Sequence, residues 1–179
     1  MNRDVQKACD SSPTQILKVP TYLVGGMDET AGIYARESTY LDRYVQLGIA
    51  QGRVISVSFR SVPDEGAEDD HDLLDRIESY LQGTEDDFTD VEIALTVPTD
   101  QRDVLQQLRE VPYGDQISVE QLVRMTPGLD PDEESDHTLV REALAENPAP
   151  LLIPDHRVRD GPSAAPAPVE QKLRAVEGL

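Results

Sequence analysis

The chain has 179 residues, a length that fits one compact domain or two small ones. Its apolar runs are far shorter than the roughly 20 residues that cross a bilayer, which excludes a membrane protein. A single cysteine, Cys9, excludes both a disulfide framework and a cysteine-based metal site. No basic stretch followed by an apolar run opens the chain, so we expect no secretory signal and a cytoplasmic protein.

Acidic residues outnumber basic ones by 35 to 16, which gives a net charge of −19 and a pI near 4.3. At ordinary ionic strength this self-repulsion destabilises a compact state. The composition therefore favours a protein adapted to high salt, where the repulsion is screened. The alternative is an acidic chain with disordered parts, but periodic apolar segments run through most of the sequence and argue against it.

The first 27 residues differ from the rest in charge, with three cations against two anions. Their hydrophobic periodicity is weak. We therefore expect residues 1–27 to form a poorly ordered extension. The alternative is that they precede a true start at Met27, in place of Met1.

Residues 28–97 combine strand and helix patterns. Three segments have the composition and length of strands, and they span residues 32–36, 44–50 and 54–59. Gln51 and Gly52 predict a tight turn between the last two. A helix is predicted where apolar residues recur at helical spacing, namely at Leu73, Leu74, Ile77 and Leu81, with Gly83 as its end. Residues 91–95 predict one more short strand.

The second half of the chain, 98–179, changes to helices joined by short loops. Thr99 is the predicted N-cap of the first helix. Ser118 and Gln121 form a capping-box signature that opens a second, short helix. Asp136 or Ser135 is the predicted cap of a third. Helix, turn and helix in this order resemble a DNA-binding helix-turn-helix unit.

Three motifs stand in this half. They are VPYGDQIS at 111–118, NPAPLLIPDHRV at 147–158 and LRAVEG at 173–178. In order and spacing they resemble motifs of the O6-alkylguanine-DNA alkyltransferase family, whose central motif runs from Asn-Pro through a short apolar strand to Pro-Cys-His-Arg-Val. The resemblance implies an α+β fold, with a small strand-rich N-terminal domain over 28–97 and a helical alkyltransferase-type DNA-binding domain over 98–179.

The resemblance also implies a site made of Asn147, Asp155, His156 and Glu177. In the family, a cysteine thiolate accepts the alkyl group, the adjacent His activates it through a water, and a Glu orients that His. Here Asp155 stands at the nucleophile position. A carboxylate is a far weaker nucleophile toward an alkyl carbon than a thiolate, so we predict that irreversible alkyl transfer to cysteine is absent.

Three roles for Asp155 remain open. It is a relic that serves the fold, or it reads a base, or it acts as a general base beside His156. An ionised carboxylate accepts from guanine N1–H and N2–H together, whereas O6-alkylation removes the N1 proton. The base-reading hypothesis therefore favours plain guanine. His156 is expected to pair structurally with Glu177.

Contacts with DNA are expected at five positions: Val119, Thr138, Arg141, Arg157 and Arg159. By the resemblance, Val119 and Thr138 occupy the places of a Tyr that rotates the nucleotide and an Arg that fills the gap left by a flipped base. The three arginines are placed for contact with the DNA backbone, and each of them can pair with a neighbouring acid instead. Loss of the Tyr and the Arg removes two groups that help to offset the cost of flipping a base.

No cofactor is expected. The acidic residues between Asp130 and His137 lack the spacing and the central glycine of a calcium loop, so we interpret them as a solvated loop and expect no metal site.

We therefore expect a monomeric, non-catalytic alkyltransferase-like protein that binds DNA at high salt, takes part in the recognition of alkylated guanine and works with a repair protein. Two alternatives remain. One is a residual enzyme in which Asp155 and His156 accept an alkyl group as an ester or activate water. The other is a salt-adapted interaction module without DNA binding.

Overall fold

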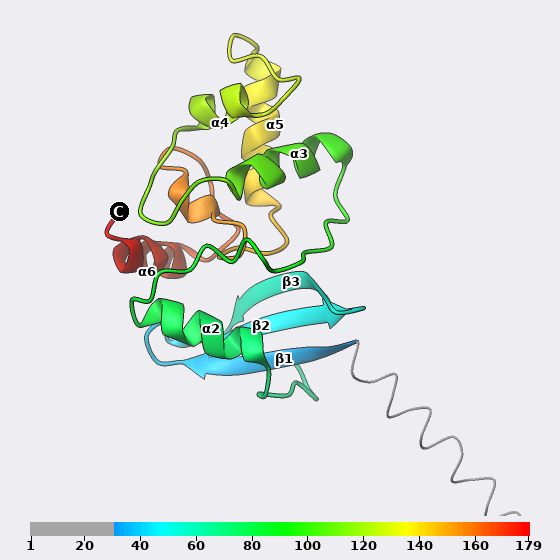
Figure 1. Cartoon of the computed structure of the whole chain (residues 1–179), viewed down its shortest axis with the longest axis vertical. Helices are drawn as coiled ribbons and strands as arrows, with labels where there is room; N and C mark the ends of the chain where they lie inside the picture. The colour runs from blue at the N-terminus through cyan, green and yellow to red at the C-terminus, as the bar shows by residue number, and fades with distance from the viewer. Residues whose placement is uncertain (1–30) are drawn as a thin grey trace, which may run out of the picture.

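The structure is a computed structural model that describes residues 31–179 (Figure 1). The expectation for residues 1–27 lies outside the described residues. Within the described part, no helix is both long enough and apolar enough to cross a membrane.

Three antiparallel strands form one sheet in the order β1-β2-β3. Their bounds are β1 (Ala31–Ser38), β2 (Arg43–Ala50) and β3 (Arg53–Arg60). Gln51 and Gly52 join the last two strands with φ of 53° and 74°, the positive values that suit the twist of a two-residue hairpin. The predicted strands and their turn are thus confirmed.

Helix α2 (Asp72–Leu81) lies across the sheet (Figure 1). It begins at the N-cap His71, whose Nδ1 accepts a hydrogen bond of 3.1 Å from the amide of Leu73. Its buried face contains the predicted apolar residues and, in addition, Tyr80. The strand expected at 91–95 is wrong, because this segment forms only an isolated parallel bridge in which Val54 N donates to Glu92 O and Ala94 N donates to Val54 O.

Three helices pack together above the sheet in Figure 1, and their bounds are α3 (Thr99–Leu108), α4 (Val119–Met125) and α5 (Glu134–Ala145). The capping box at Ser118 is confirmed. The other two caps were predicted one to three residues too late: Pro98 is the N-cap of α3, and Glu133 is the N-cap of α5. Neither makes a side-chain capping bond.

The last elements are the short 3-10 helix η1 (Asp155–Arg157) and helix α6 (Ala167–Glu177), which ends at Gly178 with φ of 79°. The apolar run before η1 forms a turn in which Leu151 has φ of 86°. This corrects the short strand that the resemblance implies.

The sheet and the C-terminal elements touch directly. The amide of Val57 in β3 donates to the carbonyl of Pro148 at 2.9 Å, and the hydroxyl of Tyr40 donates to the carbonyl of Lys172 in α6 at 3.1 Å. In Figure 1, α6 lies beside α2 at this junction. The sheet therefore supports the segment that leads into η1.

Candidate functional site

Asp155 lies at the start of η1 and is completely buried, with 0 % of its surface exposed. Three donors reach its carboxylate. Asn147 Nδ2 donates to Oδ2 at 3.1 Å, Ser163 Oγ donates to Oδ1 at 2.8 Å, and the amide of Ala164 donates to Oδ2 at 2.9 Å. No side chain of residues 31–179 forms an ion pair with Asp155. Both oxygens are thus occupied by neutral groups of the protein itself.

Burial raises the pKa of Asp155 above its ordinary value of 3.8, because the charged form loses its hydration. The bonds from Ala164, Ser163 and Asn147 work in the opposite direction and only partly offset this effect. The raised pKa makes the carboxylate more basic, but a fully buried group that already accepts three hydrogen bonds is poorly accessible as a general base.

Glu177, the last residue of α6, is a second buried carboxylate in this region. Arg157 donates to it through Nε and Nη2, both at 2.9 Å, and His156 Nε2 lies 2.9 Å from Oε1. The amide of Gly114 donates to Oε2 at 3.3 Å, and the hydroxyl of Tyr80 donates to Oε1. Burial alone would raise the pKa of Glu177, but the bonds from His156 and Arg157 outweigh it and lower the pKa to about 2.

His156 follows Asp155 in η1 and is completely buried. Since Glu177 is ionised, Nε2 carries the hydrogen and donates it to Oε1. The other ring nitrogen, Nδ1, is buried and has no hydrogen-bond partner among the described residues. The structure therefore brings together Asn147, Asp155, His156 and Glu177, as the resemblance implies.

Arg157 lies in the interior of the protein, although it was expected to contact DNA. Besides its two bonds to Glu177, it donates to the carbonyl of Val111 and, at 3.3 Å, to Asp87. Its guanidinium also lies 5.9 Å from the ring centroid of Tyr113. These bonds engage four of the five N–H groups of a buried guanidinium, so it is not available to a phosphate.

The other residues expected at DNA divide into two groups. Val119 is buried, and its amide donates to Asp160 at 2.7 Å. Thr138, Arg141 and Arg159 are exposed. The hydroxyl of Thr138 donates to a backbone carbonyl of its own helix, and neither Arg141 nor Arg159 forms an ion pair within residues 31–179.

Tyr80 belongs to the site although the motifs do not include it. It comes from α2, 97 positions before Glu177 in the chain. Its ring packs edge-on against Phe88 and Tyr113, with centroids 5.6 and 5.9 Å apart. Burial and the charge of Glu177 raise the pKa of Tyr80, so its hydroxyl stays protonated and donates. The only signal in the sequence is its place on the apolar face of the predicted helix.

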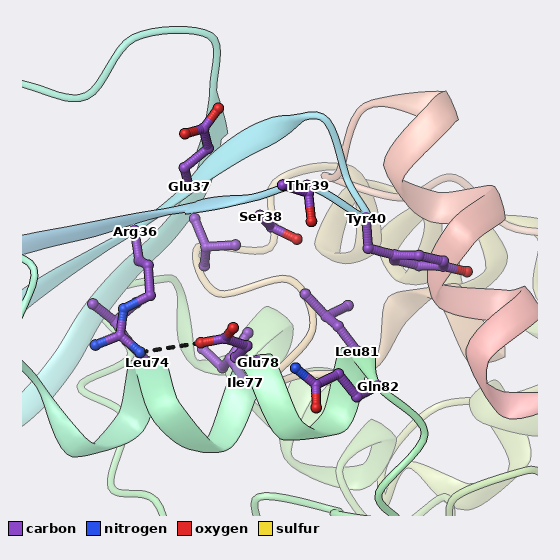
Figure 2. A pocket seen from close by; sticks show the side chains of 11 residues that line it. Arg36, Glu37, Ser38, Thr39, Tyr40, Leu74, Ile77, Glu78, Leu81 and Gln82 are labelled. Carbon is purple, nitrogen blue, oxygen red and sulfur yellow. Dashed lines mark hydrogen bonds and ion pairs between the residues drawn. The ribbon is translucent and has the colours of Figure 1, made fainter.

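No group of three or more potential metal ligands is found within residues 31–179. A pocket of about 170 Å³ lies elsewhere, between β1 and α2 (Figure 2). Its floor is apolar, and at its edge Arg36 bonds to Asp75 and Glu78. None of its lining residues belongs to the site around Asp155.

Comparison with curated proteins finds two relatives named methylated-DNA–protein-cysteine methyltransferase. The protein from Methanopyrus kandleri is 30 % identical over 117 residues, which cover 64 % of this chain and 84 % of the relative. The protein from Metallosphaera sedula is 27 % identical over 128 residues, which cover 69 % and 78 %. No family model matches the chain.

Solved structures give the same fold. The O6-methylguanine methyltransferase of Mycobacterium tuberculosis aligns with a TM-score of 0.62 and 18 % identity, over 83 % of this chain and 91 % of that one. Mycobacterium tuberculosis OGT in complex with DNA gives 0.61 and 20 %, with the same coverage. The O6-methylguanine-DNA methyltransferase of Pyrococcus kodakaraensis gives 0.59 and 20 %, over 83 % and 99 %. The expected α+β fold is confirmed.

Proposed function

Because this chain belongs to the methylated-DNA–protein-cysteine methyltransferase family, we propose that it is a DNA-binding protein of DNA repair that does not transfer alkyl groups. Its ligand is duplex DNA, with alkylated guanine as the base to be recognised. It acts without a cofactor, as a monomer in the cytoplasm, and passes the DNA to a repair partner.

One observation supports the proposal that the protein does not transfer alkyl groups. By the motif resemblance, Asp155 takes the position of the family's cysteine, and its carboxylate is fully buried and accepts three hydrogen bonds. An attack on an alkyl carbon needs a free lone pair in reach of the substrate. Asp155 offers neither the reactivity of a thiolate nor access.

DNA as the ligand is supported by family membership and by the complex of Mycobacterium tuberculosis OGT with DNA. In this chain, α4 and α5 with the turn between them serve as the helix-turn-helix unit, and α5 presents Thr138 and Arg141 on its surface. Arg159 is the further exposed cation for a phosphate contact.

The salt concentration determines whether this acidic chain can bind DNA, so it has to be chosen with care in the test. Counterion release normally supplies much of the affinity for DNA, but a chain with a net charge of −19 repels phosphates in dilute buffer. At high salt this repulsion is screened. Shape complementarity and apolar contacts then have to supply the affinity.

The test is binding, in about 2 M KCl, to labelled duplexes that carry guanine or O6-methylguanine at one position. Thr138→Arg is measured alongside, because it restores the side chain that the family uses to fill the gap of a flipped base. Arg141→Ala removes the expected phosphate contact. Arg53→Ala, at an exposed arginine of β3 paired with Glu92, is the matched control.

Binding that Arg141→Ala weakens and Arg53→Ala does not supports the proposal. Preference for O6-methylguanine identifies a damage sensor, whereas equal binding identifies general DNA binding by the same surface. Absence of binding by the wild type and by Thr138→Arg would overturn the proposal and favour the alternative of a salt-adapted interaction module.

A further inference from the structure

Residues 160–165, which we name the strap, run directly over Asp155. Two consecutive residues of the strap satisfy the two carboxylate oxygens: Ser163 Oγ donates to Oδ1 at 2.8 Å, and the amide of Ala164 donates to Oδ2 at 2.9 Å. The amide of Ala165 in turn donates to Ser163 Oγ at 3.1 Å. The strap is thus bonded to Asp155 at its middle.

The first residues of the strap are fixed as well. Asp160 accepts a hydrogen bond of 2.7 Å from the amide of Val119. At Gly161, an added Cβ would lie 2.7 Å from a methyl of Leu144 in α5 and 3.2 Å from a methyl of Val119, so the backbone packs tightly against both helices. The strap therefore joins the two helices of the proposed DNA-binding unit to Asp155.

We infer that the strap is a gate over this site and that Asp155 is the positioning residue that keeps it closed. Asp155 has no exposed surface, so no ligand reaches it until Ser163 and Ala164 release the carboxylate. The inference goes beyond the proposed function, because it concerns contacts within the chain and holds whether or not DNA is the ligand.

The chemistry of the residue explains why a carboxylate suits this role. An ionised Asp has two oxygens with about four acceptor sites, which is enough for three donors, whereas a thiol is a weak acceptor with one sulfur atom. A cysteine at position 155 would leave the hydroxyl of Ser163 and the amide of Ala164 without strong acceptors. We expect that exchange alone to loosen the strap.

Amide hydrogen exchange at Ala164 and Ala165 tests the inference in the full chain. Ser163→Ala removes one strap bond and leaves the backbone and the carboxylate in place. Asp155→Ala removes all three acceptor contacts. Ser135→Ala and Asp132→Ala, at exposed positions, are the matched controls. The amide of Ile117, which donates to the carbonyl of Arg157, reports on the rest of the fold.

In Asp155→Ala we expect exchange at Ala164 to rise by about tenfold or more, as for the loss of one hydrogen bond, while Ile117 keeps its wild-type rate. In Ser163→Ala we expect the same rise at Ala165, which loses its acceptor. Unchanged rates at both strap amides, or an equal rise at Ile117, would overturn the gate.

A second readout measures access. In a Cys9→Ser background, Asp155→Cys places the only thiol of the chain beneath the strap, and Ser135→Cys places it on the surface. We expect iodoacetamide to alkylate the thiol at position 155 within about tenfold of the rate at position 135, since a strap without its anchor opens readily. A thiol at position 155 that stays unreactive in the folded chain would show that the strap closes without Asp155.

Discussion

Two buried carboxylates lie within one site and have opposite electrostatics. Glu177 is held by the guanidinium of Arg157 and by His156, and its pKa falls to about 2. Asp155 is held by an amide side chain, a hydroxyl and a backbone amide, all neutral, and its pKa rises. Both carboxylates are buried and accept hydrogen bonds, so the presence or absence of a neighbouring cation decides whether the pKa falls or rises.

Glu177 and Asp155 also differ in the parts of the molecule that they connect. Glu177, at the end of α6, accepts hydrogen bonds from Tyr80 in α2 and from His156 and Arg157 in η1, and it therefore joins the sheet side of the molecule to its C-terminal elements. Asp155 bonds only to segments near it in the chain, within nine positions. Loss of Glu177 or of its cation should thus weaken the whole fold, whereas loss of Asp155 should act locally.

The largest expected effect comes from removing the cation. Arg157→Met leaves Glu177 buried with a charge and no guanidinium, and we expect a loss of about 3–5 kcal/mol in the free energy of unfolding. Arg124→Met is the matched control, because it breaks an exposed pair with Glu120 and should cost about 1 kcal/mol or less. Denaturation by urea measures both. Equal losses in the two variants would contradict a stabilising role for the bonds between Arg157 and Glu177.

The pH dependence comes next. Since the folded-state pKa of Glu177 is about 2 and its ordinary value is 4.5, its contribution is complete above pH 4.5 and is lost as the pH falls toward 2. We expect the contribution to be on the order of 3 kcal/mol. Unfolding free energies across this range should fall less steeply for Glu177→Gln than for the wild type. Glu142→Gln, at an exposed position of α5, should follow the wild type, and a parallel curve for Glu177→Gln would refute the assignment.

A smaller effect is expected at Tyr80. Tyr80→Phe keeps the ring against its aromatic neighbours and removes only the hydroxyl that donates to Glu177, which should cost about 1–2 kcal/mol. Thermal unfolding measures it, with Tyr34→Phe as the control, since no hydrogen bond is formed by the Tyr34 hydroxyl within residues 31–179. A Tyr80→Phe variant as stable as that control would mean that the hydrogen bond from the Tyr80 hydroxyl to Glu177 does not stabilise the fold.

The last expected effect is that of Asp155→Asn, for which the direction of the change with pH is the test. The raised pKa of Asp155 means that its protonation favours the fold, a contribution that is present below pH 3.8 and is lost as the pH rises through the folded-state pKa. The wild type should therefore lose stability relative to Asp155→Asn as the pH rises toward neutrality, which unfolding free energies of both proteins across this range measure. A difference that changes in the opposite direction would place a cation beside Asp155.

The sequence predicts the part of this site that is local. Asn147, Asp155 and His156 lie within one motif, and the closing motif adds Glu177, so the resemblance brings these four residues together. The strands and α2 are predicted because apolar residues recur every two residues in a strand and every 3.6 residues in a helix, and these patterns are also local. The predicted secondary structure was wrong at residues 91–95, where a long-range bridge to Val54 decides, and locally at the N-caps of α3 and α5 and in the turn at Leu151.

The remaining features depend on contacts between distant segments. Tyr80 reaches Glu177 across 97 positions, and in the sequence its hydroxyl looks the same as that of any tyrosine on an apolar face. Arg157 has the charge of a DNA contact, and only the fold shows that it is buried. The strap has no periodicity, so nothing in its composition predicts that Ser163 and Ala164 bond to Asp155.

We propose above all that Asp155 holds the site closed and accepts no alkyl group. The most direct test is to incubate the protein with a duplex that contains O6-methylguanine and to measure the intact mass of the protein and its peptide over residues 147–159, with an active methyltransferase as the positive control. We expect the mass of this chain to stay unchanged. A gain of one methyl group on Asp155 would contradict it and establish the residual enzyme instead.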